Sequence, residues 1–354
     1  MMRSTLSLLQ KCRLPNNNGS LLSFKNNQVV NQTALFSMKS NQQYRFYSTD
    51  VKDLAPLIKE LRNRTSAPLK DCKEALIQNK NDIEKATSWL HEKGKSTANK
   101  FADRAVVEGT ISIVVNNGKA VILEMNSETD FVSRGETFRA LADQISRATL
   151  ESNLLAQSLA EIKPDTIAPQ PASGSTVADL IVGTVAKLRE NIRLRRVHAI
   201  DASNQPNTIV AGYAHDPSGT NQFGRLGSLV QLQYEGGQPD IAALNQLARN
   251  IAVHIVGVGP SYVSIESVPK VLLDEAIANK RHPNSLYDEV VLLEQKYISG
   301  EDNETVKAAV QRISKQLKTN ITIKSFVRYS VGEGMEKKVE NYGAEVMEKI
   351  NKAK

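Results

Sequence analysis

The stretch Met125-Asn-Ser-Glu-Thr-Asp-Phe-Val-Ser-Arg-Gly-Glu-Thr-Phe-Arg-Ala-Leu141 joins the apolar segment 120–125 to an amphipathic one. Ser133 and Glu136 have the Ser-x-x-Glu spacing of a capping box, which predicts that a helix starts at Ser133. Phe131 then lies on the turn between strand and helix. This strand, turn and helix form the local unit from which the rest of the fold is predicted.

The turn residues Thr129, Asp130, Phe131 and Val132 leave two interpretations open. In extended chain the neighbours Phe131 and Val132 point to opposite faces, so only one of them can be core. Phe131 can plug a local core, because single apolar residues near a surface are common. Alternatively, an exposed Phe beside an acid is a candidate anchor for contact with another protein.

Two units that consist of a hairpin and then a helix are expected. Asn117-Gly118 between alternating apolar segments is the strongest short-range hairpin signal, and a helix at 135–150 completes the first unit. The second unit has the same shape, which suggests an internal pseudo-repeat without visible sequence identity. The expected strands are 110–115, 120–125, 208–214 and 226–233, and the second helix starts after Pro239.

Residues 51–94 carry three short apolar stripes, which predict a three-helix unit. Pro68 suits the first position of the second helix, Asn81 and Glu84 cap the third, and Gly94 is a good stop. A unit of about 45 residues has a small core and usually serves as a docking module.

These patterns predict an α+β protein with an N-terminal three-helix domain, a core of two hairpin-plus-helix subdomains with antiparallel sheet, and a C-terminal helix. Further expected elements are a surface loop at 158–176, a helix at 177–190, strands at 192–200 and 321–329, and a turn at 332–334. The expected divisions are a leader, 1–47; a docking domain, 51–94; a connecting helix, 95–107; core subdomains 108–203 and 204–330, the second with a charged helical insertion at 270–317; and a C-terminal helical module, 331–354.

The net charge of +7 is concentrated in the N-terminal leader. Residues 1–49 hold six basic residues and no Asp or Glu, which leaves 39 basic and 38 acidic residues elsewhere. The leader is typical of an organellar transit peptide, although a disordered polar tail has a similar composition. Arg45-Phe-Tyr-Ser48 resembles a mitochondrial processing site with cleavage near Tyr47. We therefore expect a protein of the mitochondrial matrix with no nucleic-acid partner.

The sequence contains no recognisable motif for nucleotide binding, metal binding or catalysis. It has no G-x-x-x-x-G-K-[ST] phosphate loop, so direct nucleotide binding is not expected. The histidines, among them His254, lack metal-ligand spacing, and Cys12 and Cys72 are the only cysteines, so neither a metal nor another cofactor is expected. No catalytic triad is recognisable, and no apolar run approaches the ~20 residues that span a membrane. The residues alone predict a binding protein rather than an enzyme.

Several segments resemble the translation elongation factor Ts family, in the family's order. Residues 57–76 and 81–86 are similar to its N-terminal domain, and Glu128-Thr-Asp-Phe-Val132 resembles its best-known motif. Arg328-Tyr-Ser-Val-Gly-Glu-Gly-Met-Glu-Lys-Lys338 resembles its C-terminal signature. The resemblance covers roughly 51–135, 180–265 and 321–347, and includes 105–109, 190–196, 224–227 and 254–257.

The resemblance implies a guanine-nucleotide exchange factor that releases GDP from mitochondrial elongation factor Tu during translation elongation and makes or breaks no bond. It also implies that the three-helix domain is similar to ubiquitin-associated (UBA) domains and docks on the GTPase. Asp130 and Phe131, within Thr129–Val132, match the pair that family members push in near the magnesium site of the nucleotide. The other implied partner contacts are Leu226, Gly227 and His254 beside that wedge, and Arg62, Leu69, Lys70 and Lys73 on the docking surface.

The sequence departs from the bacterial pattern in two places. Residues 270–296 are too short for the family's long helical hairpin, and His254-Ile-Val-Gly replaces the usual His-[IV]-Ala-Ala. Three other classes remain, the first of which is an enzyme whose active site has no local motif. A ubiquitin-like adaptor accounts for the three-helix unit only. An organellar RNA-binding protein is opposed by the near-neutral chain after the leader and by the lack of an aromatic stacking motif.

Overall fold

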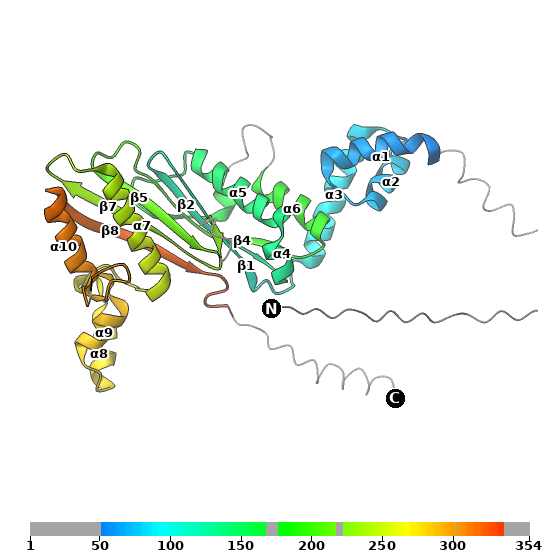
Figure 1. Ribbon diagram of the computed structural model, residues 1–354. Coiled ribbons are helices and arrows are strands. Elements are labelled where there is room, and N and C mark those ends of the chain that lie inside the picture. Colours follow the sequence, from blue (N-terminus) through cyan, green and yellow to red (C-terminus); the bar gives the residue numbers. More distant parts are fainter. Residues whose placement is uncertain (1–50, 168–175, 217–221, 302, 336–354) are drawn as a thin grey trace, which may run out of the picture. The chain divides into compact units, whose positions relative to one another are not determined.

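The computed structural model describes residues 51–167, 176–216, 222–301 and 303–335 (Figure 1). Within them the fold is α+β with antiparallel sheets, as predicted. The leader 1–47 and most of the expected C-terminal helix lie outside the described residues. The helices are α1 Val51–Thr65, α2 Leu69–Gln78, α3 Ile83–Phe101, α4 Asp130–Arg134, α5 Glu136–Glu151, α6 Val177–Leu188, α7 Ile241–Val258, α8 Lys270–Ala278, α9 Pro283–Val290 and α10 Val306–Leu317, with 3-10 turns η1 Pro164–Thr166, η2 Ile265–Ser267 and η3 Leu292–Glu294. The strands are β1 Glu108–Asn116, β2 Lys119–Ser127, β3 Ala160–Ile162, β4 Ile192–Asp201, β5 Thr208–His215, β6 Phe223–Gly224, β7 Leu226–Glu235 and β8 Asn320–Ser330.

The first three helices share a small core of their own. Leu61 of α1, Cys72 and Leu76 of α2, and Ala86 of α3 are fully buried together. Pro68 lies immediately before α2, at the N-cap, rather than at its first helical position. The apolar stripes of the sequence therefore locate these helices, with the boundaries shifted by a residue or more.

Two expected boundaries of α3 are wrong. Asp82, and not Asn81, is its N-cap: the Asp82 carboxylate accepts a hydrogen bond from Lys85 N–H at 3.0 Å, whereas Asn81 is left-handed, with φ 65°. The helix also continues past Gly94 into the segment expected to be a separate connecting helix. A Cβ on Gly94 would lie 3.2 Å from Val182 Cγ1 of α6, so this glycine permits close packing of two helices and does not end one.

The first predicted hairpin is confirmed. β1 and β2 pair antiparallel, and Asn117 and Gly118 both have positive φ, 49° and 77°, as a type I′ turn requires. The sheet order is β3-β4-β2-β1-β6, and β3 forms inside the segment expected to be a loop. Helices α5 and α6 cover one face of this sheet, where Phe138 and Ile145 of α5 are buried (Figure 1).

The second predicted hairpin is also confirmed. β5 pairs antiparallel with β7, and β8 adds on the other side of β7 to give the order β5-β7-β8. Helices α7 and α10 cover one face of this sheet. By length and composition α7 could cross a membrane, but Leu244, Ile251 and Ile255 are buried against the sheet, as in the core helix of a globular protein.

The other faces of the two sheets pack against each other. Ile111 and Ile113 of β1 share a buried cluster with Leu229 of β7. Close approach depends on glycine: a Cβ on Gly227 would lie 2.7 Å from Ile111 Cγ2, and one on Gly212 would lie 2.7 Å from Ile113 Cγ2. The core therefore has the layers helix, sheet, sheet, helix, with α4 at the end of β2.

Candidate protein-contact site

The segment between β2 and α5 folds as the short helix α4. Thr129 is its N-cap, and Thr129 Oγ1 accepts a hydrogen bond from Val132 N–H at 3.4 Å. Gly135 is extended, with φ −69° and ψ 143°, and separates α4 from α5. The motif therefore forms a helical turn, where the sequence predicted an extended one.

The predicted capping box of Ser133 and Glu136 is wrong. Ser133 is buried inside α4, and its hydroxyl donates to the Asp130 carbonyl at 3.0 Å. The helix that follows begins at Glu136 without a side-chain cap. Thr129 caps the chain about one turn earlier, which places Ser133 inside α4 with its hydroxyl bonded to the Asp130 carbonyl instead of capping the next helix.

Phe131 is 86% exposed, the highest value among the large apolar side chains that the structure describes. Val132 is half-buried and packs against the core between the first sheet and α5. Consecutive helical residues point about 100° apart, and this rotation separates the two side chains. Of the two interpretations of Phe131, the exposed anchor agrees with the structure and the core plug does not.

Asp130 lies beside Phe131 at the start of α4. Its carboxylate pairs with Arg134 at 3.1 Å, and the two side chains are 42% and 71% exposed. An ion pair this exposed is worth about 0–1 kcal/mol. Another charged group can therefore displace Arg134 from Asp130 at little cost.

The turn before α4 is fixed by two carboxylates in a reciprocal arrangement. Glu190 accepts hydrogen bonds from Thr129 N–H at 3.1 Å and from Thr129 Oγ1 at 2.6 Å. In return, Glu128 accepts one from Asn191 N–H at 2.6 Å. Hydrogen bonds to ionised groups are about twice as strong as neutral ones. Sequence reasoning did not assign Glu128 or Glu190 this role, because the partners are far apart in the chain.

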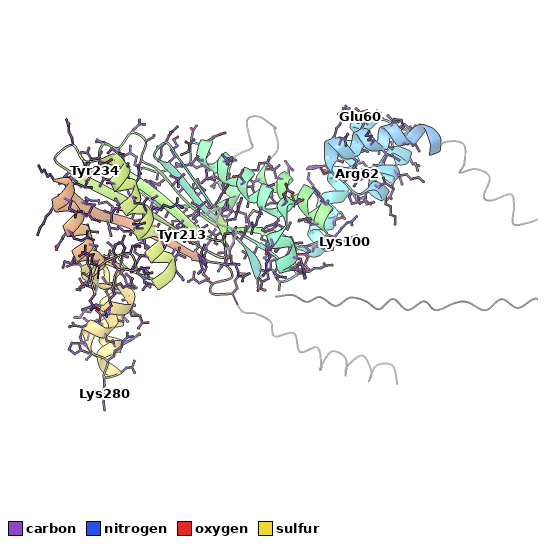
Figure 2. The ribbon with its side chains drawn as sticks, in the orientation of Figure 1. Glu60, Arg62, Lys100, Tyr213, Tyr234 and Lys280 are labelled. Carbon is purple, nitrogen blue, oxygen red and sulfur yellow. The ribbon has the colours of Figure 1, made fainter. Side chains whose placement is uncertain are left out.

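A second surface lies on the first two helices. Arg62 of α1 and Leu69 of α2, both expected on the docking surface, line one groove of about 690 Å³ (Arg62 is labelled in Figure 2). Leu69 is 58% exposed, and Lys70 next to it is also exposed. Lys73 is half-buried on the same helix. The groove also includes Lys187 of α6, which the sequence did not indicate.

Two of the other three expected contacts lie in the interior. Leu226 is half-buried at the start of β7, whereas Gly227 is buried between the sheets. His254 is fully buried in α7. Its Nδ1 accepts from Ile298 N–H at 3.3 Å, so the neutral ring carries its proton on Nε2 and donates to Gln295 Oε1 at 3.1 Å. Burial lowers the pKa of His254, which keeps this ring uncharged.

The turn at 331–334 is held by a buried charge cluster that the sequence did not indicate. Glu124 of β2 is fully buried and pairs with Arg195 at 3.1 Å and with Arg196 at 2.6 Å. The guanidinium of Arg196 lies 4.0 Å from the ring centre of Tyr329. Burial raises the pKa of Tyr329 and lowers that of His198, so both groups are neutral, and the Tyr329 hydroxyl and His198 Nδ1 share a hydrogen bond at 2.6 Å. These contacts fix where the C-terminal signature leaves the core.

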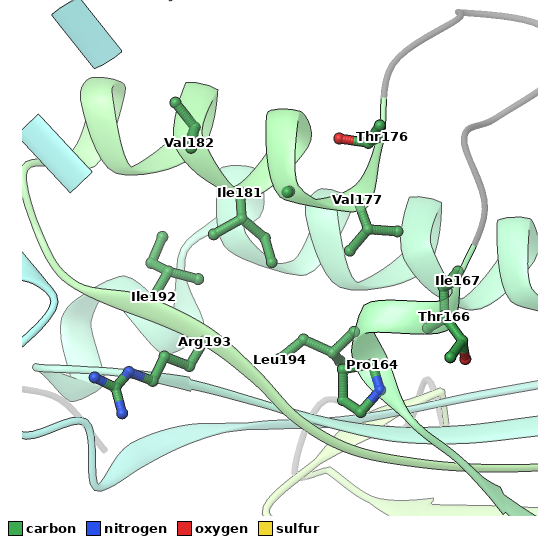
Figure 3. A pocket seen from close by; sticks show the side chains of 11 residues that line it. Pro164, Thr166, Ile167, Thr176, Val177, Ile181, Val182, Ile192, Arg193 and Leu194 are labelled. Carbon is green, nitrogen blue, oxygen red and sulfur yellow. The ribbon is translucent and has the colours of Figure 1, made fainter. Parts of the chain in front are cut away.

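An apolar groove of about 640 Å³ lies between α6 and the start of β4. Figure 3 shows Ile192 and Leu194 of β4 on one side and Ile181 and Val177 of α6 on the other. Its lining includes neither a carboxylate nor a histidine. Among the described residues no group of three or more His, Cys, Asp or Glu side chains is placed to hold a metal ion.

Phe131 is exposed on a fixed turn, and a separate groove is lined by residues of α1, α2 and α6. These two features are typical of a factor that binds another protein. The family model for elongation factor TS matches residues 128–282. Elongation factor Ts, mitochondrial, from Dictyostelium discoideum is 38% identical across 95% of this chain and 100% of that protein. Elongation factors Ts from Maricaulis maris and Agrobacterium fabrum are 36% and 34% identical, each across 82% of this chain and 96% of the relative. The chain belongs to the elongation factor Ts family.

Proposed function

We propose that this protein releases GDP from mitochondrial elongation factor Tu. Helices α1 and α2 bind the GTPase, and Phe131 contacts it as an interface anchor. Guanine-nucleotide exchange on elongation factor Tu during translation elongation is the role of the elongation factor Ts family, to which the chain belongs. The observation that carries the proposal is the 86% exposure of Phe131 on a turn fixed by hydrogen bonds. Such an aromatic is typical of an interface anchor.

Exchange by this route is a matter of linkage. If the factor weakens GDP binding by some ratio, GDP weakens binding of the factor by the same ratio. Phe131 supplies anchoring area in the state without nucleotide. Asp130, whose ion pair with Arg134 is weak, competes for the groups that order the magnesium ion. No proton is transferred and no covalent bond is made or broken, so no catalytic acid or base is needed.

Docking is assigned to the surface of α1 and α2, where Arg62 and Leu69 line the groove and Lys70 and Lys73 follow Leu69 on α2. Leu69 offers apolar area beside three cations, a composition that fits an acidic partner surface with an apolar centre. The three helices with their small common core support a UBA-like docking domain. Leu226, Gly227 and His254 have a supporting role in this proposal, because two of them present no side chain to solvent.

The working location is assigned to the mitochondrial matrix, with a leader of roughly 47 residues that is removed on import. The support is the acid-free segment 1–49 and the mitochondrial relative. N-terminal sequencing of the protein from purified mitochondria tests this assignment. An intact Met1 on the bulk of the protein would contradict it.

The deciding experiment measures release of labelled GDP from purified mitochondrial elongation factor Tu, with excess unlabelled nucleotide. The protein should accelerate release in proportion to its concentration and then saturate. An adaptor without exchange activity would bind elongation factor Tu and leave the release rate unchanged. An RNA-binding protein would show neither effect, so these outcomes distinguish the three classes.

A further inference from the structure

We propose that Glu190 is a positioning residue for exchange: its carboxylate holds the turn that presents Phe131, and its neighbour Arg189 links that turn to the docking helices. This inference rests on the proposed function. Glu190 would not touch the GTPase in this role. It acts through Thr129, whose hydroxyl and N–H both donate to the Glu190 carboxylate.

The helix that carries Phe131 is too short to hold itself. α4 has five residues, and isolated helices shorter than about 12 residues are marginal in water. Its cap bond, from Val132 N–H to Thr129 Oγ1, is long at 3.4 Å. The bond from Thr129 Oγ1 to Glu190 is much shorter, at 2.6 Å, and charge-assisted. Glu190 therefore holds Thr129 more tightly than the cap bond does, together with the Ser127 hydroxyl, which donates to the Thr129 carbonyl at 3.0 Å.

Glu190 itself stands on a fixed base. α6 ends at Arg189 in the left-handed conformation, with φ 63°, and Arg189 N–H donates to the Val185 carbonyl at 2.8 Å. On the other side, the Asn191 amide donates to the Ala102 and Arg104 carbonyls at 3.3 and 2.8 Å. Ile192 then enters β4 and is buried beneath α6 (Figure 3). The two residues that flank Glu190 are thus anchored separately, Arg189 to α6 and Asn191 to the segment that follows α3.

The same turn reaches the docking helices. Arg189 pairs with Asp71 of α2 at 2.6 Å, and Asp71 also accepts from Lys93 of α3 at 3.0 Å. Asp71 is only 8% exposed. Residues 189–191 thus contact α2 through one side chain and the Phe131 turn through the next. A factor bound through α1 and α2 therefore presents Phe131 with little further ordering, which is the benefit of preorganisation.

The positioning role and a purely structural role of Glu190 predict different results. A structural residue would lower the melting temperature and the docking affinity together when it is replaced. Glu190 is partly exposed, and its hydrogen bonds in the described part of the chain all go to Thr129. Loss of so exposed a contact should change overall stability little. The expected signature is thus a lower maximal exchange rate with an unchanged melting temperature and unchanged docking.

The test compares Glu190→Ala and Glu190→Gln with Glu136→Ala, which removes an exposed carboxylate nearby on α5. GDP release is measured over a range of factor concentrations. Glu190→Ala should lower the maximal rate about tenfold and leave the half-saturating concentration within about twofold. Glu190→Gln should recover most of the rate, because the Gln carbonyl can still accept one Thr129 bond. Glu136→Ala should match wild type.

A second measurement needs no partner. Amide hydrogen exchange of residues 132–135 in the free protein should accelerate in Glu190→Ala and not in Glu136→Ala. Unchanged protection overturns the inference, as does a normal maximal rate in Glu190→Ala when Phe131→Ala is impaired. A fall in melting temperature with a matching loss of docking would reduce Glu190 to a structural residue. If wild type fails to accelerate release while the protection result holds, the proposed function fails instead.

Discussion

The buried carboxylate of Glu124 accepts a hydrogen bond from Gly332 N–H at 2.8 Å, across 208 residues of sequence. Gly332 has φ 74°, and a Cβ there would lie 2.8 Å from the Val107 carbonyl oxygen. One carboxylate in the first sheet therefore fixes the turn after the last strand of the second. The C-terminal signature leaves the core from this point.

Glu124→Ala should destabilise the fold by about 3 kcal/mol, the low end of the range for breaking a buried ion pair. Arg195 and Arg196 keep about a quarter of their side chains in solvent, which limits the loss. Urea unfolding measures the free energy, and Glu124→Gln should retain part of it by accepting from Gly332. A loss below about 1 kcal/mol in Glu124→Ala would show that the cluster is not structural.

Phe131→Ala should reduce exchange much more than stability. An exposed side chain contributes within about 0.5 kcal/mol to folding, whereas an interface anchor contributes about 2 kcal/mol or more to the complex. That corresponds to at least a ~25-fold loss of exchange efficiency. Val271→Ala, at a 65% exposed site on α8, is the matched control and should behave as wild type. A large drop in melting temperature with normal exchange would contradict the anchor assignment.

A chain that begins at Lys95, inside α3, lacks α1, α2 and the first part of α3. It should remain folded and bind elongation factor Tu more weakly. The half-saturating concentration should rise at least tenfold, because the groove with Arg62 and Leu69 is gone. The sheets keep their own cores, so cooperative unfolding should persist. Thermal unfolding and GDP release measure the two effects. Loss of the cooperative transition would place the domain boundary elsewhere.

Gly227→Ala should destabilise the protein by about 1–3 kcal/mol, because its Cβ would lie 2.7 Å from Ile111 Cγ2 between the two sheets. Gly183→Ala is the matched control. A Cβ on Gly183 of α6 meets nothing within 4 Å, and alanine should favour the helix by up to about 1 kcal/mol. The urea midpoint should therefore fall in Gly227→Ala and rise in Gly183→Ala, relative to wild type. Equal stability of the two variants would show that the sheets can separate without cost.

Stability should fall as the pH drops below about 6.5, the ordinary pKa of histidine. Burial lowers the folded-state pKa of His254 and His198, so the unfolded chain binds more protons between that lowered value and 6.5. The stabilisation is complete above 6.5 and is lost as the pH falls through the folded pKa. Urea unfolding at pH 7.5, 6.5 and 5.5 measures the slope, which His254→Gln should reduce. An unchanged slope in His254→Gln would mean that the pKa of His254 is the same in the folded and the unfolded chain.

Local sequence determined the hairpins and most helices of this protein. Asn117-Gly118 specifies a type I′ turn through the backbone preferences of those two residues, and the spacing of apolar side chains specifies each strand or helix. The same local information misplaced the start of the helix at Ser133 and the stop at Gly94. The helix starts instead after Thr129, which Glu190 holds from 61 residues away, and at Gly94 the helix continues where the chain packs against Val182 of α6.

The tertiary structure alone decided which residues form the candidate site. Phe131 is exposed and His254 is enclosed, although each has an apolar residue directly after it in the sequence. Their environments depend on the packing of whole elements, which no short pattern contains. The contact between Thr129 and Glu190 spans 61 residues, and that between Glu124 and Gly332 spans 208. Short-range preferences set the backbone of each element, but only the packed sheets and helices bring such partners within hydrogen-bond distance.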